Sequence, residues 1–399
     1  MCAALARGRS TLNGALDSED TQVLVESLRR LGIRVDVDVA NHTIVVDGCD
    51  GRIPAAHADL FVGNSGTTVR FLTALLTLAH GTFRLDGTPR MRERPIGDLL
   101  DALGQLGGDA KSEHDQGCPP VVVRADGLRG GTATVRGDIS SQFLSGLLMA
   151  APYAQRDVEL RVEGPLVSQP YVRMTRDVMA AFGVAIDLGD LRRLVVPAGA
   201  GYQGRDYAIE PDASAASYFF AAAAITRGEV TVQGLSRDSL QGDVAFVDVL
   251  TQMGCEVRSA ADRITVVGRP LAGVEVDMNA ISDTVQTLAA VALFANGPTT
   301  ITGVAHIRHK ETDRLAALAT ELRKFGAEVD ERADGLLITP RPLHGAAIDT
   351  YDDHRMAMCL ALVGLVVPGV AIRDPGCTRK TYPHYFDDLA ALSVTGGTP

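Results

Sequence analysis

The sequence lacks any apolar run long enough for a membrane span, and it lacks the hydrophobic region of a secretory signal. Its most apolar stretches, YFFAAAAI and MAMCLALVGLVV, are too short to cross a bilayer, and strand-like segments follow them. The chain has fewer basic than acidic residues: 38 Lys and Arg but 49 Asp and Glu, which gives a net charge of −11. These features argue against a membrane or nucleic-acid partner and predict a cytoplasmic protein.

The chain also lacks cysteine and histidine groups at the spacing of metal ligands. Its six cysteines are scattered, without a CxxC motif: Cys2, Cys49, Cys118, Cys255, Cys359 and Cys377. We interpret them as buried free thiols and expect no metal site. A small anionic ligand is compatible with the acidic composition provided that its positive site is local.

What the sequence does contain is a repeat. Five times, an expected helix ends in an apolar residue and glycine and runs into an expected strand, at spacings of 71 to 76 residues. The marker glycines are Gly32, Gly107, Gly183, Gly254 and Gly326. So regular a period predicts one supersecondary unit used repeatedly.

Each full unit has the same order of parts: an apolar helix with a polar start, a short strand, an amphipathic helix, and two strands around a glycine turn. The apolar helices are predicted to begin near Ser65, Ser140, Asp212, Asp283 and Asp353. They are apolar on all sides, which predicts burial on every side. In the amphipathic helix ETDRLAALATELRKFG, we expect the charged residues opposite the apolar positions Leu315, Leu318, Leu322 and Phe325.

Strands that alternate with helices predict an α/β fold with sheets outside and apolar helices inside. Three units per domain place a boundary near residue 208, so we expect two similar domains, residues 1–208 and 209–399, with a cleft between them. The N-terminal segment LARGRSTLNG matches LAHGTFRLDG of the second unit. By that match Met1 falls in the middle of the first apolar helix, so we expect the first unit to be truncated at its N-terminus by a misplaced start.

The polar starts of two apolar helices are candidates for anion binding, since a helix N-terminus offers free N–H groups and the positive end of the dipole. GNSGTTVR places Gly66 at one such start, where it would let a ligand approach the backbone, and Arg70 one turn later. ISSQFLSGLL places three neutral donors at another: Ser140, Ser141 and Gln142. Ordinary Ser and Thr capping of a buried helix is the alternative for both motifs.

Further motifs contribute cations: Arg94 in RMRERPIG, Lys310 and Arg314 in IRHKETDRL, Arg355 in DDHRMAMCL, and Lys380 in KTYPHYF. Arginine binds phosphate or carboxylate in a bidentate manner. At the start of a fully apolar helix an unpaired charge is costly, so a ligand anion would compensate Arg355. Glu311, packed among cations, is a candidate proton donor. The alternative for these motifs is that they are charged turns exposed to solvent. Because the cations come from both expected domains, we expect a cleft that closes on a pair of anionic substrates.

Together these motifs resemble the 5-enolpyruvylshikimate-3-phosphate synthase family. The resemblance rests on GNSGTTVR, RMRERPIG, ISSQFLSGLLM, VSQPYV, PDASAASYFFAAAAI, KETDRLAALATELRKFGAEV, DDHRMAMC and KTYPHYF, in that order. It implies an inside-out α/β barrel of two domains, each with three βαβαββ units. It also implies transfer of the enolpyruvyl group of phosphoenolpyruvate to the 5-hydroxyl of shikimate 3-phosphate, with release of phosphate, in aromatic amino acid biosynthesis. No cofactor is implied, and a monomer is expected.

The resemblance implies roles for individual residues. Phosphoenolpyruvate would be bound by Gly66, Arg94, Gln142, Arg314, Arg355 and Lys380. Shikimate 3-phosphate would be bound by Ser140, Ser141, Gln142, Ser168, Tyr171, Asp283, His306 and Lys310. Asp283 would be the base for the 5-hydroxyl, and Glu311 would protonate the methylene carbon to give a tetrahedral intermediate. Two features depart from the family: His306 replaces a common Asn, and the family's Lys-Ser-x-x-x-Arg segment would lie before Met1.

Two alternatives stand beside this interpretation. A UDP-sugar enolpyruvyl transferase resembles the family in fold but uses a cysteine on the loop before an Arg-Pro pair. Residues 86–93 are DGTPRMRE, with no cysteine before Arg94, which argues against that enzyme. The other alternative is an N-terminally truncated homologue that is inactive or weakly active.

Overall fold

A computed structural model describes residues 1–395 of the chain. The chain separates into two compact units, which we call unit 1 (Met1–Ile209) and unit 2 (Glu210–Pro399). One cluster of buried apolar side chains lies wholly in unit 1 and a second lies wholly in unit 2. Because apolar burial is the main favourable term in folding, each unit has a core built from its own residues.

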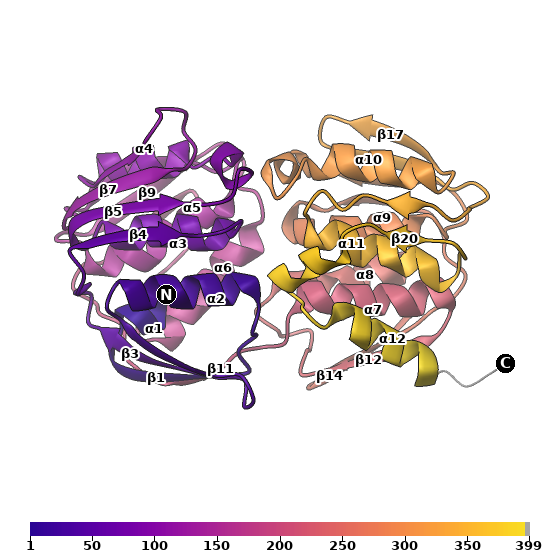
Figure 1. Cartoon of the computed structure of the whole chain (residues 1–399), viewed down its shortest axis with the longest axis horizontal. Helices are drawn as coiled ribbons and strands as arrows, with labels where there is room; N and C mark the ends of the chain where they lie inside the picture. Colours follow the sequence, from indigo (N-terminus) through magenta and orange to yellow (C-terminus); the bar gives the residue numbers. More distant parts are fainter. Residues whose placement is uncertain (396–399) are drawn as a thin grey trace. The chain divides into compact units, whose positions relative to one another are not determined.

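Unit 1 alternates helices and strands: α1 (Cys2–Leu5), β1 (Arg7–Asn13), α2 (Glu19–Arg30), β2 (Arg34–Asp38), β3 (Thr43–Cys49), β4 (His57–Phe61), α3 (Gly66–Leu76), β5 (His80–Asp86), η1 (Met91–Glu93), α4 (Gly97–Gln105), β6 (Asp109–Ser112), β7 (Val121–Asp126), β8 (Gly131–Arg136), α5 (Ser141–Ala150), η2 (Ala151–Tyr153), β9 (Val158–Glu163), α6 (Gln169–Ala181), β10 (Arg193–Val196) and β11 (Asp206–Ala208). Three small sheets result, with the orders β11-β1-β3-β2, β4-β5-β7-β6 and β10-β9-β8. Each contains one parallel pair: β1 with β11, β4 with β5, and β8 with β9. In Figure 1, β4, β5 and β7 lie side by side, and α3 packs against β5 and β7.

Unit 2 continues the pattern: α7 (Ala213–Thr226), β12 (Glu229–Gln233), η3 (Gly242–Ala245), α8 (Phe246–Gln252), β13 (Glu256–Ala260), β14 (Arg263–Val267), β15 (Glu275–Asp277), η4 (Asn279–Thr284), α9 (Val285–Ala292), β16 (Thr299–Thr302), η5 (Ala305–His309), α10 (Arg314–Lys324), β17 (Glu328–Arg332), β18 (Gly335–Thr339), β19 (Ala347–Ile348), α11 (His354–Ala361), η6 (Leu362–Leu365), β20 (Ala371–Ile372), η7 (Pro375–Lys380) and α12 (Tyr385–Thr395). Its sheets are β12-β14-β13, β15-β16-β18-β17 and β19-β20. Helix α9 packs against both α7 and α11 (Figure 1).

The architecture is therefore a mixed α/β fold in which several small sheets are packed against helices, as the alternation of elements predicted. The strands of residues 1–395 do not close into a barrel. Each four-stranded sheet combines a parallel pair with antiparallel strands, and such a parallel pair requires a crossover connection rather than a hairpin.

The repeat predicted from the marker glycines is visible in the backbone. Each marker glycine comes directly after an amphipathic helix. The φ of the glycine itself is positive: 80° at Gly32, 83° at Gly107, 95° at Gly183, 112° at Gly254 and 103° at Gly326. Glycine enters this left-handed region without a Cβ penalty, and it commonly ends helices in this way. The strand expected directly after Gly183 is wrong, because β10 begins only at Arg193. The sheet of this repeat, β10-β9-β8, accordingly has three strands.

The apolar helices are buried as predicted: α9 at every position, and α5 at every position except Gln142. Four of the predicted starts are N-caps that accept a hydrogen bond from a backbone N–H of the first turn: Ser65, Ser140, Asp212 and Asp353. Asp283 differs, because it lies in η4 and α9 begins at Val285. Its carboxylate is therefore available to other partners. No helix of residues 1–395 is both long and apolar enough to cross a membrane.

Helix α10 confirms one half of its predicted pattern. Its apolar positions Leu315, Leu318 and Leu322 are fully buried, as is Phe325 just beyond it. The expectation that its charged residues lie on the other face is wrong for Arg314 and Glu321, whose exposed fractions are 1% and 0%. From helical periodicity alone, a charged side chain is expected to face the solvent. Arg314 and Glu321 are buried instead, because each has a partner from a distant segment of the chain.

Gln286 on α9 is fully buried, and neither atom of its side-chain amide has a hydrogen-bond partner within the described residues. Burial of an unsatisfied amide is costly, so Gln286→Met, which keeps the side-chain length, should raise the free energy of unfolding by about 1–2 kcal/mol. Urea denaturation checks this, with Gln252→Met at the exposed end of α8 as the matched control. A lower free energy of unfolding in Gln286→Met would contradict the prediction.

Candidate active site

Most of the residues that the sequence singled out gather into one cluster in each unit. In unit 1 we define the helix-start cluster, around the starts of α3 and α5, as Asn64, Ser65, Gly66, Thr67, Arg70, Arg94, Ser140, Ser141 and Gln142. In unit 2 we define the ion cluster as Asp283, Lys310, Glu311, Arg314, Asp353, Arg355 and Lys380. The buried helices thus position most of the predicted site residues.

Gly66 makes room for a buried arginine at the start of α3. The Arg94 guanidinium, 3% exposed, donates to the backbone oxygen of Asn64 at 2.8 Å and to its side-chain oxygen at 3.2 Å. A Cβ at position 66 would collide with this guanidinium. A cation therefore lies beside the positive end of a helix, and both favour a negatively charged ligand at this place.

Gln142 has two partners from α3. Its amide oxygen accepts from Arg70 Nη1 at 2.7 Å, and its amide nitrogen donates to Thr67 Oγ1 at 3.1 Å. Arg70 also donates to the Pro95 carbonyl at 3.2 Å and lies 5.2 Å from the centroid of the Phe143 ring. Because arginine can only donate, Arg70 determines which end of the Gln142 amide faces it. The starts of α3 and α5 therefore form one bonded group.

Ser140, Ser168 and Tyr171 lie at the starts of α5 and α6. Ser140 caps α5 by accepting from the Gln142 N–H at 3.3 Å, as the capping alternative predicted. Ser168 has a φ of 52°, a conformation that residues other than glycine rarely adopt, and its carbonyl oxygen accepts from the Tyr171 N–H at 3.1 Å. Since α5 and α6 pack against each other, these helix starts belong to neighbouring elements.

Arg314 is the centre of the ion cluster. Its guanidinium lies 2.7 Å from the Asp353 carboxylate, 2.8 Å from Glu311 and 3.3 Å from Asp283. Arg314, the first residue of α10, thus links three carboxylates. They are Glu311 on the preceding loop, Asp283 in η4 and Asp353, the N-cap of α11. A buried arginine is tolerated only with such partners.

Asp283 joins two further cations to the cluster. Its carboxylate lies 3.1 Å from Lys310 Nζ and 3.0 Å from Arg355 Nη2. Arg355 thus has a partner within the protein, Asp283, and it also donates to the Tyr218 hydroxyl at 3.2 Å. Lys380 completes the group, with its Nζ 3.4 Å from Glu311 Oε1.

The ion cluster contains four cations and three carboxylates, so positive charge is in excess. Burial alone would raise the pKa of Asp283, but Arg355, Lys310 and Arg314 hold that pKa well below its usual range. Burial lowers the pKa of Lys310, an effect that the Asp283 carboxylate opposes. Asp283 is therefore ionised at neutral pH, and the cluster attracts anions.

Burial lowers the pKa of His306 to about 3, and the neighbouring Lys310 adds to the effect. Below the unfolded value of 6.5, the unfolded chain binds a proton that folded His306 does not. Stability that is fully present above pH 6.5 is therefore lost as the pH falls toward 3. We expect His306→Gln to lose less stability than the wild type between pH 6.5 and 4.5, by about 2 kcal/mol.

Urea denaturation at a series of pH values checks this prediction. His57→Gln, at an exposed position on β4, is the matched control and should follow the wild type. The other acid-sensitive groups are common to all three proteins, so the difference between them isolates His306. Equal slopes of stability against pH in all three would contradict the expected protonation behaviour.

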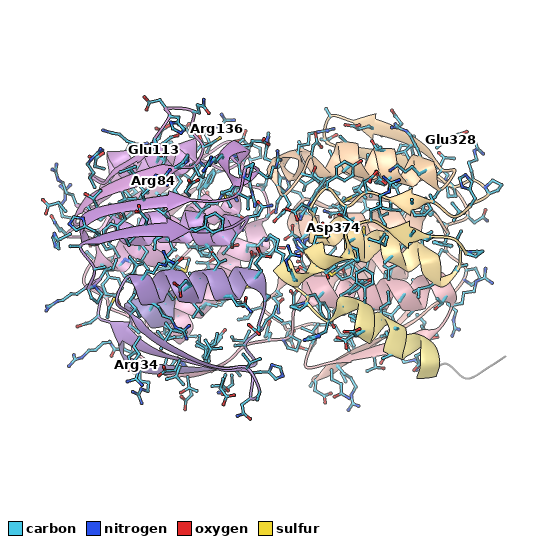
Figure 2. All side chains as sticks on the ribbon, in the orientation of Figure 1. Arg34, Arg84, Glu113, Arg136, Glu328 and Asp374 are labelled. Atoms are coloured by element: carbon cyan, nitrogen blue, oxygen red, sulfur yellow. The ribbon has the colours of Figure 1, made fainter. Side chains whose placement is uncertain are left out.

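Many charges elsewhere form exposed ion pairs. Figure 2 labels Arg84 and Glu113 on the outer face of unit 1, where they pair at 2.8 Å, and Arg136, which pairs with Asp138 at 2.7 Å. Solvent screens such pairs, and they contribute little to stability. The ion cluster differs from them because its charges are largely shielded from solvent.

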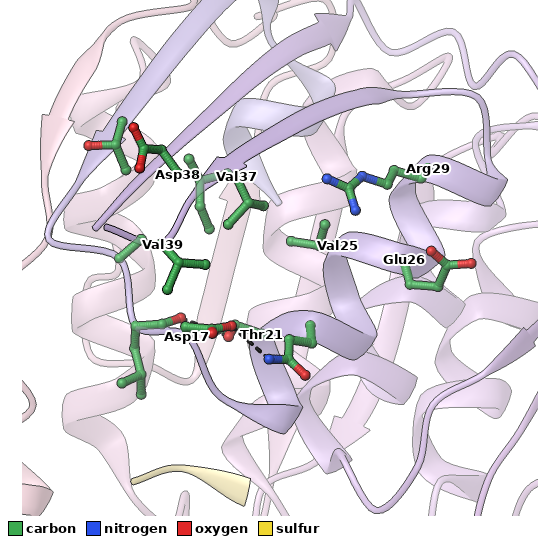
Figure 3. A pocket seen from close by; sticks show the side chains of 13 residues that line it. Asp17, Thr21, Val25, Glu26, Arg29, Val37, Asp38 and Val39 are labelled. Carbon is green, nitrogen blue, oxygen red and sulfur yellow. Dashed lines mark hydrogen bonds between the residues drawn. The ribbon is translucent and has the colours of Figure 1, made fainter. Parts of the chain in front are cut away.

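A cavity of about 370 Å³ opens in unit 1 between α2 and the β2–β3 hairpin (Figure 3). Val25, Val37 and Val39 line its apolar part, and its arginine, Arg29, donates to the Val35 carbonyl at 2.9 Å. None of the predicted site residues lines it. The cavity lacks the gathered cations of an anion site, so the two clusters are the better candidates.

Comparison with known proteins identifies the family. The family model described as EPSP synthase (3-phosphoshikimate 1-carboxyvinyltransferase) matches residues 1–389. A 3-phosphoshikimate 1-carboxyvinyltransferase from Trichormus variabilis is 51% identical over 387 residues, which cover 97% of this chain and 91% of that protein. The chain belongs to the EPSP synthase family.

Further relatives agree with membership in the EPSP synthase family. The 3-phosphoshikimate 1-carboxyvinyltransferase from Marinomonas sp. is 47% identical over 389 residues, 97% of this chain and 92% of that protein. A solved EPSP synthase from Acinetobacter baumannii has a TM-score of 0.80 at 24% identity and covers 98% of this chain and 92% of its own, which supports the mixed α/β fold. The resemblance inferred from the motifs is confirmed, and the comparisons give no support to a UDP-sugar enolpyruvyl transferase.

Within this EPSP synthase fold, sequence reasoning missed several partners of the residues that it named. Asn64 holds Arg94, Tyr218 accepts from Arg355, and Asp353 pairs with Arg314. Two of these leave a signal in the sequence. Asp353 precedes an apolar helix as an N-cap, and Tyr218 places a hydroxyl on a helix that is buried all round, where a partner is required.

Proposed function

We propose that this protein transfers the enolpyruvyl group of phosphoenolpyruvate to the 5-hydroxyl of shikimate 3-phosphate and releases phosphate. One observation carries the proposal: in a chain of the EPSP synthase family, Glu311 and Asp283 lie among four cations in the ion cluster. The excess positive charge suits two anionic substrates, and two carboxyl groups suit a reaction that moves two protons. The name of the relatives, 3-phosphoshikimate 1-carboxyvinyltransferase, describes the same transfer.

We assign phosphoenolpyruvate to groups that suit its phosphate and carboxylate. The proposed contacts are Gly66, Arg94, Gln142, Arg314, Arg355 and Lys380. Guanidinium groups form paired, charge-assisted bonds with such anions. The buried Arg94 beside the N-terminus of α3 supports its part of the assignment.

We assign shikimate 3-phosphate to a more neutral set of donors. The proposed contacts are Ser140, Ser141, Gln142, Ser168, Tyr171, Asp283, His306 and Lys310. The left-handed backbone of Ser168 supports its inclusion, because strained residues cluster at ligand sites. The lowered pKa of His306 keeps its ring neutral, so it can exchange a hydrogen bond with a hydroxyl without adding charge.

In the proposed reaction, Asp283 takes the proton of the 5-hydroxyl as that oxygen attacks C2 of phosphoenolpyruvate. Glu311 donates a proton to C3, and a tetrahedral intermediate forms. Glu311, left ionised by that transfer, then takes a C3 proton as the C2–O bond to phosphate breaks, and phosphate leaves. The low pKa of Asp283 makes it a weak base while its cations surround it. Substrate anions that engage Arg355 and Lys310 would weaken that effect and raise the pKa of Asp283.

We also propose the finer architecture that the family resemblance implies. Residues 1–208 and 209–399 would form two inside-out α/β domains, each of three βαβαββ units, in a cytoplasmic monomer that needs no cofactor. The recurring parallel pairs and the five left-handed marker glycines support a common unit. Sedimentation equilibrium over a range of protein concentrations tests the monomer.

Release of inorganic phosphate from phosphoenolpyruvate tests the proposed function. We expect release to require shikimate 3-phosphate, and mass spectrometry should find a product that joins the two substrates and lacks one phosphate. Shikimate without its phosphate is the matched control and should give slow release. Release that depends instead on a UDP-sugar would favour the alternative transferase, and no release with either acceptor would contradict the proposal.

A further inference from the structure

The segment before α11 holds two consecutive residues in the left-handed region of backbone space. The φ of Tyr351 is 57° and that of Asp352 is 53°. Neither residue is glycine, so each pays a Cβ penalty for this conformation. Such backbone persists when surrounding contacts hold it, and it occurs disproportionately where function needs it.

The contact that holds this turn is a buried carboxylate on α10. Glu321 is 0% exposed, and it accepts from the Tyr351 hydroxyl at 2.7 Å and from the Asp349 backbone N–H at 3.0 Å. Lys324 Nζ lies 2.7 Å from the same carboxylate. Three donors thus satisfy Glu321, and two of them belong to the turn.

Helix α10 holds the turn at a second point. Arg314 and Glu321 are seven residues apart, which is about two helical turns or 10 Å along one face. At the first turn of α10, Arg314 binds the Asp353 carboxylate at 2.7 Å. The segment from residue 349 to residue 353 is therefore fixed at both ends by a single rigid helix.

The residues that follow the turn belong to the ion cluster. The Asp353 carboxylate accepts from the Arg355 N–H at 2.9 Å and so begins α11. Arg355 then reaches Asp283 at 3.0 Å. A change in the backbone at Tyr351 would thus change the place of Asp353 and Arg355.

We propose that Glu321 is a positioning residue of the enzyme: by binding Tyr351 and the Asp349 amide, it holds the left-handed turn that places Arg355 for phosphoenolpyruvate. The inference rests on the proposed function, since it concerns how one of the assigned contacts is oriented. Neither Glu321 nor Tyr351 touches the ion cluster through a described bond, so both act through the turn.

An alternative is that Glu321 only balances the charge of Lys324. Lys324 is partly exposed and has a second partner, Asp349 Oδ2, at 2.8 Å. Under this alternative the Tyr351 hydroxyl would not matter. The two explanations therefore separate on a substitution that removes the hydroxyl and leaves every charge in place.

Tyr351→Phe is that substitution, and steady-state kinetics is its test. We expect the KM for phosphoenolpyruvate to rise about tenfold, the loss expected for one hydrogen bond, while the KM for shikimate 3-phosphate changes less than about twofold. Tyr382→Phe is the matched control, because it removes a tyrosine hydroxyl that donates to Asp388 at 2.8 Å in the same unit. An unchanged KM for phosphoenolpyruvate, or equal changes in both KM values, would overturn the proposal.

Amide hydrogen exchange provides a readout that does not depend on activity. The Asp349 N–H donates to Glu321 and the Asp353 N–H donates to the Thr350 carbonyl at 2.9 Å. Glu321→Gln and Tyr351→Phe should both accelerate exchange at these two amides, and Tyr382→Phe should not. If the wild type releases no phosphate, the proposed function is wrong. Hydrogen exchange alone then tests whether Glu321 holds the turn. Unchanged exchange at the two amides in Glu321→Gln and Tyr351→Phe would overturn that proposal.

Discussion

Glu311→Gln is expected to lower kcat for phosphate release by about 10²- to 10⁴-fold, the usual contribution of a general acid. The Glu311 carboxyl lies between Arg314 at 2.8 Å and Lys380 at 3.4 Å and is 8% exposed. Glutamine keeps the volume and can still accept from Arg314, but it has no proton to give to C3. Loss of one negative charge beside four cations should leave the KM for phosphoenolpyruvate unchanged or lower.

The split between kcat and KM separates a chemical role from damage to the fold. Glu331→Gln is the matched control, because Glu331 on β17 also pairs with an arginine, Arg308, at 2.8 Å, outside the ion cluster. That variant should keep the kcat of the wild type. A kcat near the wild-type value in Glu311→Gln would remove Glu311 from the proton transfer.

The parts of the fold that sequence could predict are those that repeat. A glycine after each amphipathic helix has a local cause, since the left-handed backbone that ends a helix excludes most other residues. The N-caps Ser65, Ser140 and Asp353 have a local cause as well, because their side chains bond within the next three residues. Local rules therefore located four of the five predicted helix starts, and part of the candidate site lies at those starts.

The partners within each cluster could not be predicted in this way. Arg355 and Asp283 are 72 residues apart, and nothing in either motif names the other. Glu321 lies three residues after Leu318 and four before Phe325, beside the apolar face of α10, and nothing near it in the sequence names its partner Tyr351, 30 residues later. Such long-range pairs depend on how helices and strands pack against one another. A single sequence shows which face of a helix is apolar, but it does not show which distant residue that face contacts.

Arg314→Met is expected to lower the free energy of unfolding by about 3–5 kcal/mol, because it leaves buried carboxylates without their shared cation. The exposed fractions of Arg314 and Asp353 are 1% and 0%. Methionine fills a similar volume without a charge, so the loss is electrostatic more than steric. Urea denaturation measures it, and Arg341→Met, which breaks an exposed pair with Glu328, should match the wild type.

A second substitution decides whether the loss comes from the unpaired carboxylate. Asp353→Asn removes the charge but keeps an N-cap for α11, because asparagine caps helices about as well as aspartate. In the wild type it leaves Arg314 short of one partner, whereas in Arg314→Met it removes an unpaired buried charge. Its cost should therefore be smaller in the Arg314→Met background, by about 2 kcal/mol or more, as expected for groups in contact. Equal costs in both backgrounds would show that the two side chains act independently, and the central pair of the ion cluster would then not account for the stability of this region.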